Sequence, residues 1–136
     1  MKNKKGFTLI ELTVVLAILA IIAAILIPTF LITTDRARLR GDIQTARIIQ
    51  NAIELYAVER GGLPGGANID AMIQTLIAAG YLPRRTIEPQ TRGVWVWEAN
   101  RVRVDISGND VSEGTRSAFQ NLTLEEKEYV LFRSAP

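Results

Sequence analysis

The sequence predicts an α+β protein in which one very long N-terminal helix packs on a small antiparallel β-sheet. Three patterns lead to this fold class. An almost uncharged apolar stretch runs from Phe7 to Ile32, and apolar residues then recur at helical spacing up to residue 59. After residue 93, short segments rich in Val, Trp and Tyr alternate apolar with polar side chains, which is typical of half-buried strands.

The apolar stretch has the length of a membrane span. No charged side chain occurs between Leu12 and Ile32, and a helix needs about 20 residues to cross a hydrocarbon core. A secretory signal peptide has a shorter apolar region, of about 7 to 15 residues. We therefore predict a transmembrane helix, with Lys2, Lys4 and Lys5 on the cytoplasmic side.

The helical pattern continues well beyond the apolar stretch. An apolar stripe is formed by Leu39, Ile43, Ala46, Ile49, Ile53 and Ala57. The opposite, polar face is predicted to present Asp42, Gln44, Arg47, Asn51 and Glu54. One helix over 7–60, bent at Pro28 or Gly41, would be about 80 Å long. Because this exceeds any compact domain of this size, lipid or other subunits must cover its N-terminal half.

Glycine, proline and helix-capping residues predict where the remaining elements begin and end. Four glycines and a proline in 61–66 end the long helix, Asn68 caps a short second helix, and Gly80 closes it. Residues 93–106 predict a β-hairpin with its turn near 98–100. A last strand is expected at 128–133, after a helical turn that Thr123 caps with Glu126. Three antiparallel strands would then pack on the stripe of the long helix.

The most specific motif lies at the start of the apolar stretch. Gly6-Phe7-Thr8-Leu9-Ile10-Glu11, with the apolar run and Pro28, closely resembles the leader and N-terminal helix of type IV prepilins and of the pseudopilins of type II secretion and competence systems. The resemblance is strong over about the first 30 residues and loose over the following helix. It implies the pilin fold, with a cleaved leader (1–6), a transmembrane and polymerisation helix (7–33) and an extracytoplasmic head (34–136).

The resemblance also implies roles for individual residues. Prepilin peptidase would cut after Gly6, and the new amine of Phe7 would be methylated. Glu11 and Phe7 would act in assembly, Glu11 by pairing with the N-terminal amine of a neighbouring subunit. The alternative is that Glu11 reaches the headgroups and pairs with nothing, although an acidic group at the bilayer centre costs at least ~2.5 kcal/mol and usually has a partner. Pro28 lacks an N–H and loosens a helix, and the matching segment in assembled pilins, here 20–27, is often partly unwound.

The implied function is that of a structural subunit of a type IV pilus-like filament. Its partners would be copies of itself, related minor pilins, prepilin peptidase and the inner-membrane assembly platform. The subunit would cross the inner membrane once, N-in and C-out, before it enters an extracellular or periplasmic filament. The first alternative is a pseudopilin of a type II secretion or competence DNA-uptake system. A monomeric membrane-anchored binding module is the alternative from another class.

Composition argues against an enzyme. The chain has no histidine and no cysteine, which excludes His or Cys catalysis and His/Cys metal sites, and the remaining polar residues form no catalytic motif. We expect no catalytic residue, metal or cofactor.

Two other candidate binding sites remain open. Trp95 and Trp97 beside Arg101 and Arg103 are of the types that bind single-stranded DNA, but we favour a core or subunit-contact role. Residues 105–113 have oxygen ligands suited to calcium, yet they are also ordinary turn residues.

Overall fold

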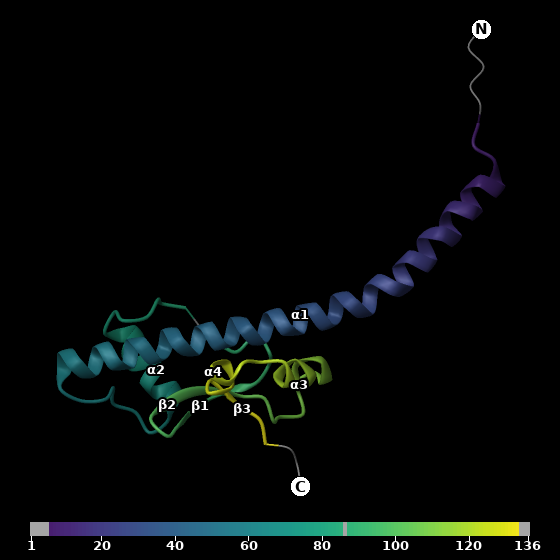
Figure 1. The fold of residues 1–136 in the computed structure, drawn as a ribbon. Coiled ribbons are helices and arrows are strands. Elements are labelled where there is room, and N and C mark those ends of the chain that lie inside the picture. The colour runs from purple at the N-terminus through teal and green to yellow at the C-terminus, as the bar shows by residue number, and fades with distance from the viewer. Residues whose placement is uncertain (1–5, 86, 134–136) are drawn as a thin grey trace.

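The computed structural model describes residues 6–85 and 87–133, without the side chains at positions 28 and 29. Its elements are α1 (Leu9–Arg60), α2 (Ile69–Ala78), β1 (Val94–Glu98), β2 (Arg101–Asp105), α3 (Glu113–Gln120), α4 (Leu124–Lys127) and β3 (Val130–Leu131). Figure 1 shows that all other elements lie along the second half of α1, while its first half projects away from them. The predicted class, a long N-terminal helix with a small sheet, is confirmed. Lys2, Lys4 and Lys5 lie outside the described residues.

Helix α1 is continuous over 52 residues. The expected bend takes the form of a smooth curve in the half that contains Pro28 (Figure 1), and neither this proline nor Gly41 interrupts the helix. Residues 20–27 are helical in the single chain. The helix ends where the glycines predict: Gly61 adopts the left-handed conformation (φ 74°), and its N–H donates to the Ala57 carbonyl.

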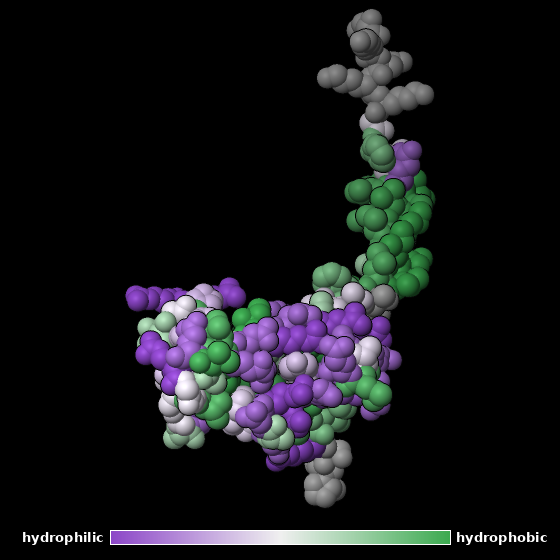
Figure 2. Space-filling model, turned by 60° about the vertical axis from the view of Figure 1, so that its left-hand side comes forward, coloured by the Kyte–Doolittle hydropathy of each residue, from purple (hydrophilic) through white to green (hydrophobic). Residues whose placement is uncertain are grey.

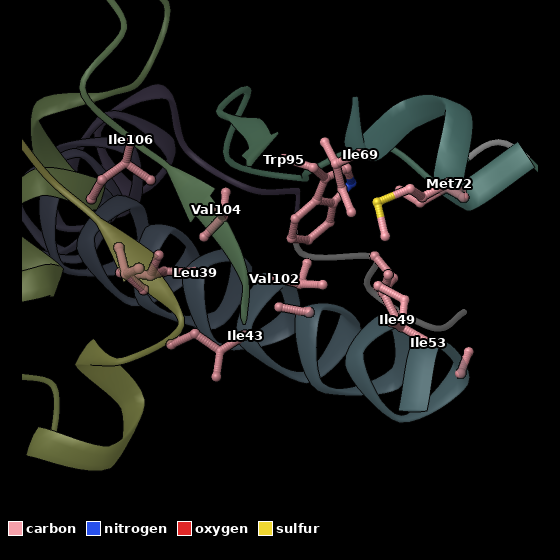
Figure 3. Close-up of a cluster of buried hydrophobic side chains, with 14 of the residues drawn as sticks. Leu39, Ile43, Ile49, Ile53, Ile69, Met72, Trp95, Val102, Val104 and Ile106 are labelled. Atoms are coloured by element: carbon pink, nitrogen blue, oxygen red, sulfur yellow. The ribbon is translucent and has the colours of Figure 1, made fainter. Parts of the chain in front are cut away.

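The core of the head is built on the predicted stripe of α1. Leu39, Ile43, Ala46, Ile49 and Ile53 are at most 1% exposed. Figure 3 shows the four larger side chains of this stripe facing β2 residues Val102 and Val104, with Trp95 and the α2 residues Ile69 and Met72 at one end of the cluster. Since complete burial of one aliphatic side chain stabilises by about 1.5–3 kcal/mol, this stripe fixes the head to the second half of α1.

Asp42 departs from its predicted place on the polar face, because it is only 1% exposed. Its carboxylate accepts hydrogen bonds from Gln90 N (2.7 Å), Thr91 N (3.0 Å) and Thr91 Oγ1 (2.5 Å). The sequence analysis predicted Asp42 on the polar face because it is charged. Its position, however, is adjacent to Leu39 and Ile43 on the buried side of the helix. Burial is tolerated because the 90–91 loop supplies three donors.

The sheet confirms the predicted hairpin and corrects the third strand. β1 pairs antiparallel with β2, with Trp95 opposite Val104, and the turn residues Ala99 (φ 52°) and Asn100 (φ 61°) have the left-handed conformation that a two-residue hairpin turn requires. β3 instead pairs parallel with β2, so the sheet is mixed, in the order β1-β2-β3. Parallel neighbours need a crossover connection. Here 106–129 supplies it and contains α3, a helix that the sequence analysis did not predict.

Capping residues define the short helices. Asn68 Oδ1 accepts from Ala71 N at 2.9 Å, and Gly80 (φ 85°) follows the end of α2, both as predicted. The predicted Thr123–Glu126 capping box starts α4. Ser112 caps α3 and also donates to Asp35 Oδ2 at 2.8 Å, which fastens α3 to the part of α1 next to the apolar stretch.

Candidate functional site

The first half of α1 is an uncovered apolar surface. Every described side chain from Phe7 to Ile32 is exposed. Among the described helices, α1 is the one that is long and apolar enough to cross a membrane, with a mean hydropathy of 3.0 over its most apolar window. Figure 2 shows this hydrophobic stalk rising from a largely polar head. Such a surface is stable only when lipid or other protein removes it from water.

Thr8 and Glu11 form a reciprocal hydrogen-bonded cap at the tip of this stalk. The Thr8 backbone N–H and the Thr8 hydroxyl both donate to Glu11 Oε2, at 2.9 Å and 2.8 Å. In return, Glu11 N–H donates to Thr8 Oγ1 at 3.3 Å. This is a capping box, which satisfies backbone donors at the start of a helix and places a negative charge at its positive end.

Glu11 keeps one oxygen for another donor. Both bonds from Thr8 end on Oε2, and no donor among the described residues reaches Oε1. The carboxylate borders a shallow recess of about 380 Å³ lined by Phe7, Ile10, Glu11, Val14 and Val15. Spacings of three and four residues place these side chains on one face of the helix. A cationic group could thus bind at Oε1 between apolar side chains.

The other predicted site residues occupy different surroundings. Gly6 and Phe7 precede α1 in an irregular exposed segment, and Phe7 is 83% exposed. A Cβ at Gly6 would meet no atom of the described residues within 4 Å. Pro28 belongs to the same helix but is about 26 Å from Glu11 along its axis. The structure brings Phe7 and Glu11 together and leaves Pro28 apart.

Sequence reasoning assigned no role to Thr8. A signal for it was present, because Thr8-Leu9-Ile10-Glu11 has the T-x-x-E spacing of a capping box ahead of an apolar run. That spacing lies inside the longer motif, in which Glu11 is the charged residue and was therefore the one assigned a role.

The profile of the prokaryotic N-terminal methylation motif matches residues 1–27. The chain has a prepilin-type N-terminus. It is 45% identical to prepilin peptidase-dependent protein D of Escherichia coli K12 over 71 residues, 50% of this chain and 49% of the relative. It is 44% identical to the type IV wide pilus major component PilA4 of Thermus thermophilus over 62 residues, 43% of this chain and 45% of the relative.

A longer but weaker match extends into the head. The chain is 24% identical to type II secretion system core protein G of Escherichia coli K12 over 124 residues, 89% of this chain and 81% of the relative. By contrast, the chain spans only about half the length of the first relatives that it matches. No solved structure matches the chain significantly. The family-model match over residues 1–27 contains the capped carboxylate of Glu11.

Trp95 of β1 belongs to the core, and Trp97 is half-buried against it. Trp95 is 6% exposed, and its Nε1 donates to the Ile87 carbonyl at 2.8 Å. The arginines beside them are paired within the chain: Arg101 with Glu128 (2.6 Å) and Arg103 with Glu98 (3.6 Å). The burial of Trp95 and the pairing of both arginines favour the core interpretation over stacking on single-stranded DNA.

The acidic segment 105–113 is held by local bonds. Asp105 Oδ1 accepts from Ser107 N (2.9 Å), Ser112 caps α3, and Glu113 pairs with Arg116 at 3.1 Å. Within the described residues, no group of three or more Asp, Glu, His or Cys is close enough to hold a metal ion. The segment acts as a turn and a helix cap.

Proposed function

We propose that this protein is a structural subunit of a type IV pilus-like filament. It is made as a precursor that crosses the inner membrane once, N-in and C-out. A prepilin peptidase cuts it between Gly6 and Phe7, the Phe7 amine is methylated, and the mature chain polymerises through α1. We assign it no catalytic role. The observation that carries the proposal is the uncovered first half of α1 with a single carboxylate near its tip.

The length of α1 supports polymerisation rather than simple anchoring. Its 52 residues extend about 78 Å, and the head covers only the second half. Outside the bilayer, we propose that the α1 helices of other subunits cover the first half. We propose the corresponding domain division: a leader (1–6), a transmembrane and polymerisation helix (7–33) and an extracytoplasmic head (34–136).

Glu11 supplies the polar contact of the proposed assembly. No donor among the described residues bonds its Oε1, and the recess beside it is apolar. A methylated N-terminal amine on an aromatic residue has matching chemistry: a cation for Oε1 and a ring for the recess. The amine of Phe7 on a neighbouring copy would then fix how far each new subunit advances along the filament.

An exposed apolar stripe continues along the head half of α1. Ile48, Leu55 and Val58 face away from the core and are 56%, 51% and 83% exposed. Two arginines that flank the stripe are already paired within the chain, Arg47 with Glu125 (2.8 Å) and Arg40 with Glu126 (3.5 Å). A neutral apolar stripe beside neutralised charges is suited to contact α1 of neighbouring subunits.

The proposal is tested first in the native host. N-terminal mass spectrometry should find a chain that begins with methylated Phe7. Glu11→Ala should reach wild-type levels in the membrane but yield no sheared filaments, whereas Glu54→Ala, which removes an exposed carboxylate from the head half of α1, should assemble normally. An intact Met1, or normal filaments from Glu11→Ala, would contradict the proposal.

A cross-linking experiment tests the packing of α1. Because the chain has no cysteine, Leu55→Cys can be combined with single cysteines scanned through 16–27, and disulfides can be induced in sheared filaments. We expect dimers and ladders at positions repeating every three to four residues. Val94→Cys, 60% exposed on β1, is the control for the fixed position. Assembled filaments without any cross-link to Leu55→Cys would exclude this packing.

A pseudopilin is the second candidate. It is favoured by the match to a type II secretion core protein, which extends over 89% of the chain, further than the matches to the pilus components. Deletion of the gene should abolish secretion of exported enzymes if this is correct. Loss of surface filaments with intact secretion would favour the pilus.

A further inference from the structure

Arginines collect where the apolar half of α1 meets the head. If residues 12–32 cross the hydrocarbon core, which is about 30 Å thick, Arg36 lies about 6 Å beyond its edge along the helix axis. Each headgroup layer of a bilayer is about 5–7 Å thick, so Arg36 is at the depth of the lipid phosphates. Arg38 and Arg40 follow it, on the side that the proposed topology places outside, where Lys and Arg are usually less frequent.

Arg36 lies on the side of α1 that carries the head, but the head does not cover it. It precedes Leu39 by three residues and Ile43 by seven, so it belongs to the same face of the helix as these two buried residues. Arg36 is nevertheless exposed, and it forms no ion pair with a described residue. This guanidinium therefore lies at the edge of the head that faces the bilayer.

The loop before β1 brings a second arginine to the same end of the head. The buried Asp42 accepts a hydrogen bond from Thr91 N at 3.0 Å, which fixes this loop on α1. Arg92 follows directly and is exposed, with a left-handed backbone (φ 63°) that is unfavourable for a residue with a Cβ. It lines a recess of about 120 Å³ together with Arg38 of α1. Like Arg36, Arg92 forms no ion pair with a described residue.

Most carboxylates at this end of the head already have partners. Asp35 pairs with Arg38 at 3.8 Å, and Glu113 pairs with Arg116 at 3.1 Å. Asp110 lines the same recess as Arg92 and has no ion pair among the described residues. An anion would therefore bind Arg92 at the rim of the recess rather than inside it.

We propose that Arg36 and Arg92 bind phosphate groups of phospholipids in the leaflet that the head faces, and that this contact holds the head on the bilayer before assembly. A guanidinium group matches phosphate oxygens with two parallel hydrogen bonds. Figure 1 shows that α3, which Ser112 fastens to Asp35, lies at the end of the head nearest the apolar half of α1. The inference rests on the membrane orientation in the proposed function, but it does not require a filament.

A lipid titration tests the contact. The full chain in a neutral detergent is titrated with phosphatidylglycerol, and bound lipid is counted by native mass spectrometry. Arg36→Gln and Arg92→Gln should each weaken binding roughly fivefold, the scale of one basic residue at an anionic surface. The matched control is Arg84→Gln with Arg85→Gln, which removes two exposed arginines beside α2 and should leave binding unchanged.

Two results of the titration would overturn the inference. One is wild-type affinity in the variant that combines Arg36→Gln with Arg92→Gln, or an equal loss of affinity in the control. The other is displacement of the lipid by an equal concentration of inorganic phosphate, because the site would then take free phosphate rather than a lipid headgroup. Tryptophan fluorescence of each variant checks that the head remains folded.

A second measurement tests where the head lies. Because the chain has no cysteine, a fluorophore can be placed at Asn109→Cys, in the exposed loop before α3, or at Leu63→Cys, beyond the far end of α1. In nanodiscs with spin-labelled headgroups, the first should be quenched more strongly than the second, and combining Arg36→Gln with Arg92→Gln should remove this difference. Unchanged quenching in that variant would contradict the inference. Normal filaments from Glu11→Ala would reject the proposed function and leave both lipid results standing.

Discussion

The buried carboxylate of Asp42 should be the polar group on which the head depends most. It is 1% exposed and accepts three hydrogen bonds, two from Thr91 and one from Gln90. These bonds tie the 87–92 segment, which leads into β1, to the middle of α1. Asp42→Ala would remove the acceptor without inserting anything that could clash.

The cost of Asp42→Ala follows from the burial of the donors that remain. Thr91 is 4% exposed, so its N–H would stay unpaired, whereas Gln90 is exposed and its N–H can return to water. A lost hydrogen bond to a charged group and a buried unpaired donor together cost about 3 kcal/mol. That is a large fraction of the roughly 5–15 kcal/mol that holds a small domain folded.

Urea unfolding of the full chain in detergent micelles measures this cost. Both tryptophans of the chain, Trp95 and Trp97, lie in β1, so their fluorescence reports the head rather than the membrane half. The unfolding midpoint of Asp42→Ala should fall by about 1.5 M urea, for a slope near 2 kcal/mol/M. Gln44→Ala, exposed on the same helix, is the control. An unchanged midpoint for Asp42→Ala would refute the reasoning.

Three further predictions use the same unfolding assay. Leu39→Ala, at a fully buried position, should lower the free energy of unfolding by about 2–5 kcal/mol, whereas Leu124→Ala, 86% exposed, should change it by less than about 0.5 kcal/mol. Gly80→Ala should cost about 1–2 kcal/mol, because its φ of 85° is unfavourable for a residue with a Cβ. The Thr123 N–H, with Arg40 and Arg47 nearby, holds the pKa of Glu126 below its ordinary value of 4.5. Because the folded pKa is the lower one, this stabilisation is present above about pH 4.5 and is lost on acidification, so Glu126→Gln should weaken the acid dependence of unfolding.

Local patterns predicted most of the fold. The glycines at 61–66, the Asn68 cap and the alternation in β1 and β2 each act over a few residues, so a single sequence is enough to place them. The parallel pairing of β3 was not predictable in this way. It depends on how the 106–129 crossover packs, through α3 and Asp35, against a helix more than 70 residues earlier in the chain.

The candidate site was predicted in part. Glu11 is conspicuous because it is charged within an apolar run, while Thr8 looks like any other small polar residue beside it. Its importance comes from the direction of its hydroxyl, which a helix start determines. Asp42 was misplaced for a related reason: charge predicts exposure on average, and only the fold brings the Gln90 and Thr91 donors to it.

The apolar half of α1 cannot by itself determine the register of the proposed filament. Lipid tails are as apolar as leucine, so the transfer of the described side chains of this half from lipid to neighbouring helices gains little hydrophobic free energy. A helix with similar side chains along its length also packs almost equally well after a shift of one turn. Glu11 breaks this degeneracy, because a shift of one turn, about 5.4 Å, would remove the neighbour's amine from Oε1. If register depends on this contact, moving the carboxylate to position 15 by Glu11→Val with Val15→Glu should not restore normal filaments, even though net charge and amino-acid composition stay the same.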